Sequence, residues 1–209
     1  MKVTNMLKLG IILALFAAAA CVMLAFVYTG TASIISRRQK ADLETALQEI
    51  FPGADSFKPA KGIKSPDAAV TIEDAYMAIR GGKPAGAALR LTRASYGGPI
   101  KILAGVSTDG TITGVKIMEH SDTPGLGANA ASPKYFVDKA KGITFYGQFA
   151  GKSVNDPFEV KGDVTAVTSS TITSRAVAST VKAAAVAVTS WFAGLDVDAV
   201  SAATEGDAE

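Results

Sequence analysis

The sequence has one cysteine and one histidine in 209 residues, Cys21 and His120. Structural zinc sites and iron–sulfur clusters are held by about four ligands, mostly cysteine and histidine. We therefore expect no metal site and no iron–sulfur cluster bound by this chain. Cys21 lies inside an apolar segment, so the rest of the chain has neither a disulfide framework nor a thiol to oxidise. This cysteine usage favours a domain outside the cytoplasm.

Charge is missing from a long stretch near the amino terminus. No charged residue occurs from Leu9 to Ser36, a run of 28 positions, and a helix crosses a bilayer with about 20 apolar residues. The run predicts an uncleaved, single-pass membrane anchor over residues 1–36. The alternatives are a cleaved signal peptide and lipoprotein processing at Cys21, but the apolar run continues beyond Cys21 for longer than a signal peptide requires. Basic residues flank both ends, so their count does not orient the anchor.

The remainder of the chain has no excess of either charge. Two of the 21 basic residues, Lys2 and Lys8, precede the apolar run, which leaves 19 basic against 19 acidic residues. Proteins that bind nucleic acid carry a basic surface. We therefore expect no nucleic-acid partner.

Periodicity after the anchor predicts an α+β fold. Apolar residues recur at helical spacing over residues 37–50 and a proline- and glycine-containing loop follows, so residues 37–68 are expected to form an amphipathic helix and linker. Alternating runs and glycine turns predict three or four antiparallel strands, at 75–79, 86–92, 100–106 and 111–118. We expect an N-terminal transmembrane helix followed by one mixed, largely antiparallel sheet domain, residues 69–195, flanked by helices.

Two further helices are expected in the second half of the chain. Ser132 and Pro133 have the N-cap and first-turn pattern of a helix that Gly142 would close. Apolar residues from Val177 to Phe192 recur at helical spacing and predict a buried C-terminal helix. The acidic residues 196–209 are expected to be a frayed tail.

Hydroxyl side chains are concentrated directly before the predicted C-terminal helix. The cluster and the arginine after it are Thr168, Ser169, Ser170, Thr171, Thr173, Ser174 and Arg175. Unpaired N–H groups and the macrodipole make a helix start attractive to anions, and Arg175 adds positive charge if its side chain folds back. The cluster therefore indicates a phosphate site, with an ordinary capped and solvated turn as the alternative.

The run from Thr168 to Ser174 resembles the Ser/Thr-Gly-Ala-Thr-x-Thr/Ser motif of the FMN-binding domain. This domain occurs in the G subunit of the Rnf complex and in the C subunit of the Na+-translocating NADH:quinone reductase. The resemblance implies that FMN is attached covalently to Thr171 through a phosphoester, by a flavin transferase. The chain departs from the motif at Ser169 and Ser170, where the family usually has Gly-Ala, and at Thr165, where it has an aspartate.

Two glycine-containing segments carry the same resemblance. Residues 123–127, Thr-Pro-Gly-Leu-Gly, match the family's loop beside the isoalloxazine ring, with Asp122 in place of the preceding glutamate. Residues 95–98, Ser-Tyr-Gly-Gly, are similar to its Gly-Tyr-Gly-Gly turn, although a plain glycine-rich hairpin is the alternative. The residues that the resemblance implies at the ring are Thr123, Gly125, Leu126, Gly127, Tyr96 and Gly97.

The resemblance implies a flavoprotein subunit that relays electrons within an ion-translocating ferredoxin:NAD oxidoreductase, rather than a self-contained enzyme. Its partners would be the other membrane and iron–sulfur subunits. The protein would lie in the cytoplasmic (inner) membrane, with its soluble domain on the extracytoplasmic side. We expect no catalytic residue, since Glu119, His120 and Asp122 have the pattern of loop-capping or solvated residues.

Two other functions remain open at this point. One is a membrane-anchored small-ligand-binding or sensory module without redox activity. The other is a hydrolase with a serine or threonine nucleophile, for which His120 is the nearest base but no motif links it to a nucleophile.

Overall fold

The computed structural model describes residues 3–194, and the chain divides into two compact units, Met1–Thr45 and Ala46–Glu209. Helix α1 runs without a break from Val3 to Ile50. One helix thus covers residues for which the sequence predicted an anchor and a separate amphipathic helix. The tail predicted at residues 196–209 lies outside the described residues.

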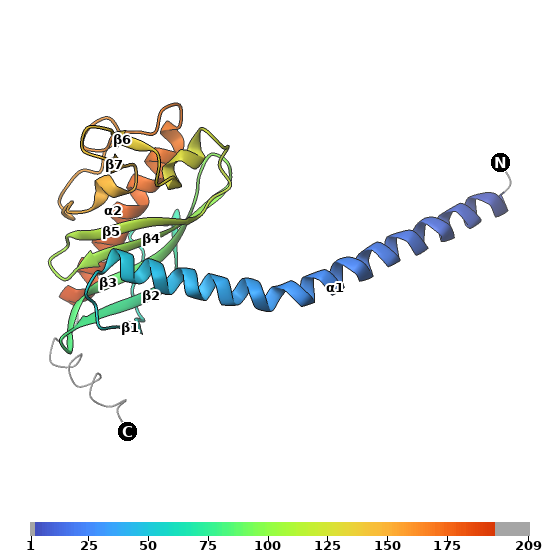
Figure 1. Cartoon of the computed structure of the whole chain (residues 1–209), viewed down its shortest axis with the longest axis horizontal. Coiled ribbons are helices and arrows are strands. Elements are labelled where there is room, and N and C mark those ends of the chain that lie inside the picture. The colour runs from blue at the N-terminus through green and yellow to red at the C-terminus, as the bar shows by residue number, and fades with distance from the viewer. Residues whose placement is uncertain (1–2, 195–209) are drawn as a thin grey trace, which may run out of the picture. The chain divides into compact units, whose positions relative to one another are not determined.

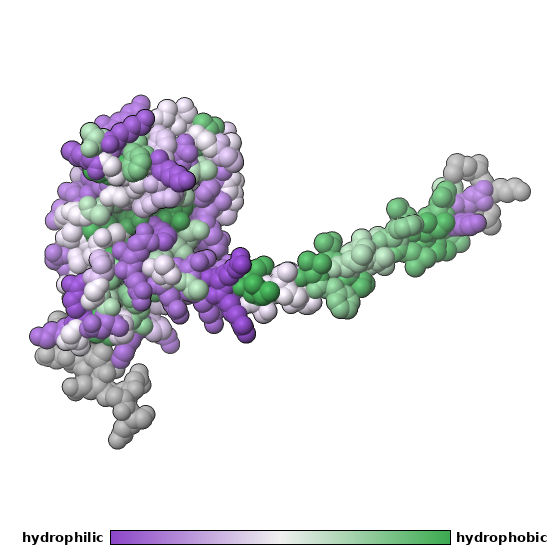
Figure 2. Space-filling view, in the orientation of Figure 1, coloured by the Kyte–Doolittle hydropathy of each residue, from purple (hydrophilic) through white to green (hydrophobic). Residues whose placement is uncertain are grey.

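Within the described residues, two helices are long and apolar enough to cross a membrane, α1 over Asn5–Ile50 and α2 over Thr171–Ala193. None of the apolar window of α1 is buried, whereas 56% of that of α2 is buried. Helix α2 is therefore a core helix of the second unit. Figure 2 shows a nearly continuous hydrophobic surface along the first part of α1. There the hydroxyls of Thr29 and Thr31 donate to carbonyls one turn earlier, so both are satisfied inside the helix.

The second unit is built on an antiparallel sheet of five strands in the order β1-β2-β3-β4-β5. The strands are β1 Ser56–Pro59, β2 Val70–Arg80, β3 Lys83–Ala94, β4 Pro99–Ser107 and β5 Ile112–Glu119. The α+β class and all four predicted strands are confirmed. Strand β1 was missed because it is only four residues long and contains a proline, so it has no readable alternation.

Helix α2 packs on one face of this sheet, against β3 and β4 (Figure 1). Every second residue of β4 faces the helix and is buried: Ile100, Ile102, Ala104 and Val106. The helix contributes small buried residues, including Ala178, Val181, Ala184, Ala185 and Val188. This core confirms the predicted buried C-terminal helix and fixes where its amino end lies.

The end of α1 packs on the opposite face of the sheet, on a surface of glycines. Gly105 of β4 pairs with Gly114 of β5. A Cβ added to Gly105 would lie 2.8 Å from Cε2 of Phe51, and one on Gly114 would lie 3.1 Å from the Cα of Ile50. Residues from Ala46 onward therefore join the second unit, and the compact unit begins earlier than residue 69.

The segments between β5 and α2 are short. They are η1 Gly127–Ala131, the paired strands β6 Phe136–Asp138 and β7 Ile143–Thr144, and η2 Gly147–Phe149. The helix predicted to begin at Ser132 is wrong. The Ser132 hydroxyl instead accepts a hydrogen bond from the Lys134 N–H at 3.3 Å, which closes a local turn. Gly142, with φ of 65°, turns the chain between β6 and β7.

Candidate functional site

Helix α2 begins with unpaired donors. Ser170 is its N-cap, but the serine side chain makes no capping hydrogen bond and is only 8% exposed. The amides of Thr171, Ile172 and Thr173 have no acceptor inside the helix, and among residues 3–194 no other group accepts from them. Three N–H groups are thus free at the positive end of α2, the arrangement that binds anions.

Hydrogen bonds with the side chains of Ser174 and Tyr135 hold the loop that precedes α2. The hydroxyl of Ser174 is fully buried, donates to the Ser170 carbonyl at 2.9 Å and accepts from the Val167 N–H at 2.9 Å. The phenol of Tyr135 donates to Oγ1 of Thr168 at 3.1 Å and accepts from the Thr168 N–H at 3.1 Å. These hydrogen bonds hold the pKa of Tyr135 below its ordinary value. Two members of the hydroxyl cluster, Thr168 and Ser174, are therefore held by hydrogen bonds within the protein itself.

Ser169 adopts a backbone conformation that favours glycine. Its φ is +59°, in the left-handed region, where a Cβ crowds the following carbonyl. The motif that this run resembles has glycine at the same position. The departure at Ser169 therefore keeps the loop conformation but at an energetic cost.

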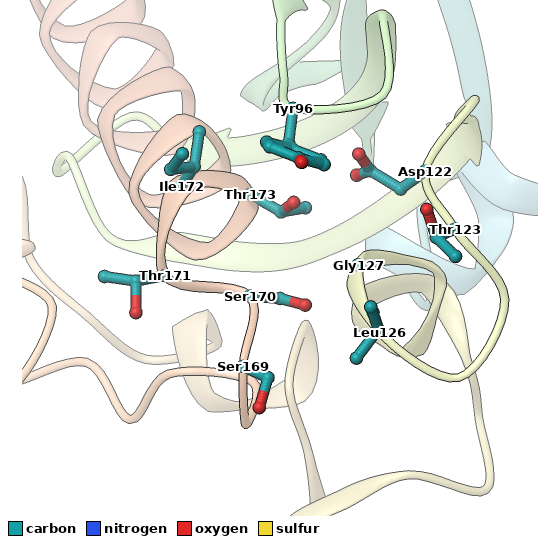
Figure 3. A pocket seen from close by; sticks show the side chains of 10 residues that line it. All are labelled: Tyr96, Asp122, Thr123, Leu126, Gly127, Ser169, Ser170, Thr171, Ile172 and Thr173. Carbon is teal, nitrogen blue, oxygen red and sulfur yellow. The ribbon is translucent and has the colours of Figure 1, made fainter.

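A cleft of about 390 Å³ opens beside the start of α2. Its lining residues are Tyr96, Asp122, Thr123, Leu126, Gly127, Ser169, Ser170, Thr171, Ile172 and Thr173 (Figure 3). In that view Tyr96, Asp122 and Ile172 lie along one side, and Leu126 and Ser169 lie along the other.

The rim of the cleft is apolar and exposed. Tyr96 is 71% exposed, Ile172 57% and Leu126 44%. Outside α1, these three and Phe136 are the exposed large apolar side chains of the described residues. Apolar surface gathered around a few polar groups is typical of a ligand site, and here it adjoins the free N–H groups of α2. This combination suits a flat ligand that has an anionic end.

A buried carboxylate joins the two glycine-containing loops at this cleft. Asp122 is 6% exposed, and its carboxylate accepts from the Gly97 N–H at 2.7 Å and from the Ser95 hydroxyl at 3.1 Å. A Cβ on Gly127 would lie 2.7 Å from Cγ of Asp122 and 2.8 Å from Oγ1 of Thr173. The two loops and the first turn of α2 therefore meet in direct contact.

The structure brings most of the predicted site residues together. Eight line the cleft: Tyr96, Thr123, Leu126, Gly127, Ser169, Ser170, Thr171 and Thr173. Gly125 and Thr168 line a neighbouring depression of about 620 Å³, which shares Leu126 and Ser169 with the cleft and also includes Lys134 and Lys139.

The other three predicted residues line neither hollow. Gly97 and Ser174 hold the surrounding loops through the hydrogen bonds described above. Arg175 is exposed and is the fifth residue of α2, just beyond its first turn.

Two cleft residues were not predicted. Ile172 occupies the variable position of the motif, and only the exposure of its side chain marks it as part of the site. Asp122 was treated as a loop cap, and only its contacts with Ser95 and Gly97 show that it joins two loops. His120 is exposed and does not line the cleft, and Glu119 pairs with Lys101 at 2.8 Å.

Comparison with known proteins identifies the family. Residues 95–186 match the family model described as the FMN-binding domain, and residues 1–50 match the RnfG N-terminal region. The chain is 34% identical over 181 residues to the G subunit of the ion-translocating oxidoreductase complex of Cereibacter sphaeroides, a match that covers 82% of this chain and 79% of the relative. The chain belongs to this family of G subunits.

Other similar proteins come from different organisms. The chain is 34% identical over 189 residues to the G subunit of the Na(+)-translocating ferredoxin:NAD(+) oxidoreductase complex of Acetobacterium woodii, covering 82% of this chain and 86% of that one. It is 33% identical over 174 residues to the G subunit of the ion-translocating oxidoreductase complex of Methanosarcina acetivorans, covering 81% and 87%. Among solved structures, NqrC of Shewanella oneidensis matches with a TM-score of 0.42 and 20% identity, over 62% of this chain and 64% of that one.

Proposed function

We propose that this chain is a membrane-anchored flavoprotein that carries FMN and relays electrons within an ion-translocating ferredoxin:NAD oxidoreductase (Rnf) complex. The observation that carries the proposal is the uncapped start of α2 beside an apolar-rimmed cleft. All ten lining residues fall within the segment that matches the FMN-binding domain. Bound FMN would supply the electron chemistry, while the protein holds and surrounds it.

The residues of the cleft fit FMN. Its phosphate is an anion, and the free amides of Thr171, Ile172 and Thr173 are donors at the positive end of a helix. Its ring is flat and largely apolar, as are the exposed rim side chains of Tyr96 and Leu126. No cysteine or histidine lines the cleft, so its residues suit an organic cofactor better than a metal ion.

The proposal includes a covalent bond between FMN and Thr171. Thr171 is the first residue of α2, is partly exposed, and its hydroxyl makes no hydrogen bond with any of residues 3–194. It is therefore available to a flavin transferase that would form a phosphoester there. Such a bond keeps the cofactor from being lost outside the cytoplasm.

The other predicted roles are proposed on the same basis. Near the phosphate we propose Thr168, Ser169, Ser170, Thr173, Ser174 and Arg175. At the ring we propose Thr123, Gly125, Leu126, Gly127, Tyr96 and Gly97. Residues 1–36 are the proposed anchor and 37–68 the proposed helix and linker, while 69–195 carry the flavin. The proposed partners are the membrane and iron–sulfur subunits of the complex, with the soluble domain on the extracytoplasmic side of the cytoplasmic membrane.

The cleft gives less support to a hydrolase. A serine or threonine nucleophile needs a base within hydrogen-bond reach, and no histidine or lysine lines the cleft. The one carboxylate there, Asp122, already accepts two hydrogen bonds. A small-ligand module without redox activity would use the same cleft, and the cofactor it contains distinguishes the two functions.

Intact mass spectrometry tests the flavin proposal. The full-length chain would be produced in membranes together with a flavin transferase, alongside Thr171→Ala and the matched control Ser170→Ala. We expect the added mass of FMN on the parent protein and on S170A, and an unmodified mass for T171A. An unmodified parent would rule out covalent attachment. Added mass on T171A would place the bond at another residue.

Membrane extraction tests the anchor. The parent protein should remain in the membrane pellet after alkaline carbonate treatment, because an apolar span of this length is held by the bilayer. A variant that lacks residues 1–36 should move to the supernatant. Release of the parent protein would contradict an uncleaved anchor.

A further inference from the structure

We propose that Asp122 positions Tyr96 at the cleft and, through its fixed negative charge, lowers the reduction potential of the flavin bound there. The positioning role follows from hydrogen bonds and packing alone. The effect on the potential rests on the proposed flavin site. Asp122 is thus a positioning residue with an electrostatic effect, and no catalytic step is assigned to it.

The two hydrogen-bond donors to Asp122 lie on either side of Tyr96. The Gly97 N–H lies 2.7 Å from Oδ1, and the Ser95 hydroxyl lies 3.1 Å from Oδ2. Tyr96 itself is 71% exposed and lines the cleft, so little else packs on its ring. The Asp122 carboxylate therefore holds the backbone on both sides of Tyr96. Figure 3 shows this carboxylate directed toward Tyr96.

Asp122 and the turn at residues 95–98 are packed so closely that a looser contact could not replace these hydrogen bonds. A Cβ on Gly97 would lie 2.4 Å from the carbonyl oxygen of Ser121 and 2.7 Å from the Cα of Asp122. On the other side, a Cβ on Gly127 would meet Cβ and Cγ of Asp122 at 2.7 Å. Gly97 thus allows its turn to approach the backbone of Ser121 and Asp122, and Gly127 allows its loop to approach the Asp122 side chain. The position of the turn depends on this contact.

The charge of Asp122 is not neutralised locally. Both of its hydrogen-bond partners, the Gly97 N–H and the Ser95 hydroxyl, are uncharged groups. No Lys, Arg or His nitrogen lies within 4.0 Å of it among residues 3–194. With 6% exposure, water screens this charge poorly. A negative charge therefore remains in the wall of the cleft.

That charge opposes reduction of a cofactor in the same cleft. A flavin that accepts electrons becomes more negative unless each electron arrives with a proton, and a nearby fixed charge changes its electronics. Repulsion between like charges raises the free energy of the reduced form. Asp122 should therefore lower the potential, and removing its charge should raise it.

The experiment compares two substitutions in full-length, flavin-carrying protein purified in detergent. Asp122→Asn removes the charge but keeps an acceptor for the Gly97 N–H, whereas Ser95→Ala removes one donor and leaves the charge. We expect the midpoint potential, from a spectroelectrochemical titration at pH 7, to shift positive in D122N. In S95A it should stay unchanged or shift negative, because the charge has lost a partner. A purely structural role would move both potentials in the same direction.

Hydrogen exchange tests the positioning role of Asp122 in protein without the flavin. In Thr171→Ala protein, the peptide covering residues 95–98 should exchange slowly, remain slow when Asp122→Asn is added, and exchange faster with Asp122→Ala. Equal exchange in all three would overturn the positioning role.

The outcomes separate this proposal from the function proposed above. A flavin-carrying D122N with the parent potential, or a positive shift in S95A, would overturn the electrostatic effect while leaving the flavin site intact. If D122N does not accumulate, Asp122→Ala, which also removes the charge, takes its place in the titration, and its potential should likewise shift positive. A parent protein without flavin would overturn the proposed function and the effect on the potential together. The exchange experiment would still test the positioning role of Asp122.

Discussion

Tyr135 and Thr168 are joined by two hydrogen bonds, with the Oη of Tyr135 at 3.1 Å from both the amide nitrogen and Oγ1 of Thr168. The contact ties the segment before β6 to the loop before α2. The free N–H groups of α2 are thus placed by residues that belong to different parts of the chain.

Tyr135→Phe should destabilise the second unit by about 1–2 kcal/mol, since it removes both hydrogen bonds and leaves the Thr168 N–H without its partner. Thermal unfolding of the full-length protein in detergent measures the effect. Tyr146→Phe is the matched control, because the Tyr146 hydroxyl has no hydrogen-bond partner among residues 3–194. Equal loss of stability in both variants would contradict a role for the Tyr135–Thr168 pair.

Ser169→Gly should stabilise the protein by about 0.5–1 kcal/mol. A serine at φ of +59° is strained, and glycine adopts this conformation without the clash. Ser170→Gly is the control: with φ of −135° it has no such strain to relieve, and the added flexibility of the unfolded chain should lower stability. The two changes should therefore shift the midpoint of chemical unfolding in opposite directions.

Asp163 should make stability fall in acid. Burial raises the pKa of Asp163, but the hydrogen bond from Lys152 at 2.8 Å and the N–H of Glu159 at 2.6 Å outweigh it and hold the pKa below its ordinary value. The ionised carboxylate therefore stabilises the fold above its unfolded pKa of about 4. That stability is lost as the pH falls through the lower folded value.

Free energies of unfolding at pH 7 and pH 3 measure this loss. The difference between the two pH values should be smaller in Asp163→Asn than in the parent protein. Glu159→Gln, a change at an exposed position, should keep the parent's difference. An unchanged difference in D163N would show that other carboxylates cause the acid sensitivity.

Gly105→Ala should destabilise the second unit by about 1–3 kcal/mol, the usual cost of overpacking. The new Cβ would lie 2.4 Å from Oγ1 of Thr113 and 2.8 Å from Cε2 of Phe51, so the end of α1 would have to move off the sheet. Gly30→Ala, where nothing lies within 4 Å, is the control and should leave thermal unfolding unchanged. Wild-type stability in G105A would show that the contact with Phe51 is easily rearranged.

The errors in the sequence prediction have local causes. Strand β1 has four residues, too few to show alternation. The Ser132-Pro133 pattern predicted a helix, but no apolar face continues it, and the serine closes a turn while residues 136–138 pair with β7. Start signals alone do not make a helix, because most helical stability comes from packing of an apolar face.

The sequence by itself determined the uncharged apolar run, the four longer strands, the buried C-terminal helix and the hydroxyl cluster before it. These features depend on periodicity and composition over neighbouring residues, which sequence records directly. The motif resemblance also placed eight residues that line one cleft.

Only the tertiary structure decided which hydroxyls remain free and which hold the loop. Ser170 and Ser174 look alike in the sequence, yet Ser174 is fully hydrogen-bonded inside the domain and Ser170 caps nothing. Asp122 likewise joins Ser95 and Gly97, which precede it by 27 and 25 residues. The physical reason is that hydrogen-bond partners and burial are set by segments distant in the chain, whose meeting no local pattern records.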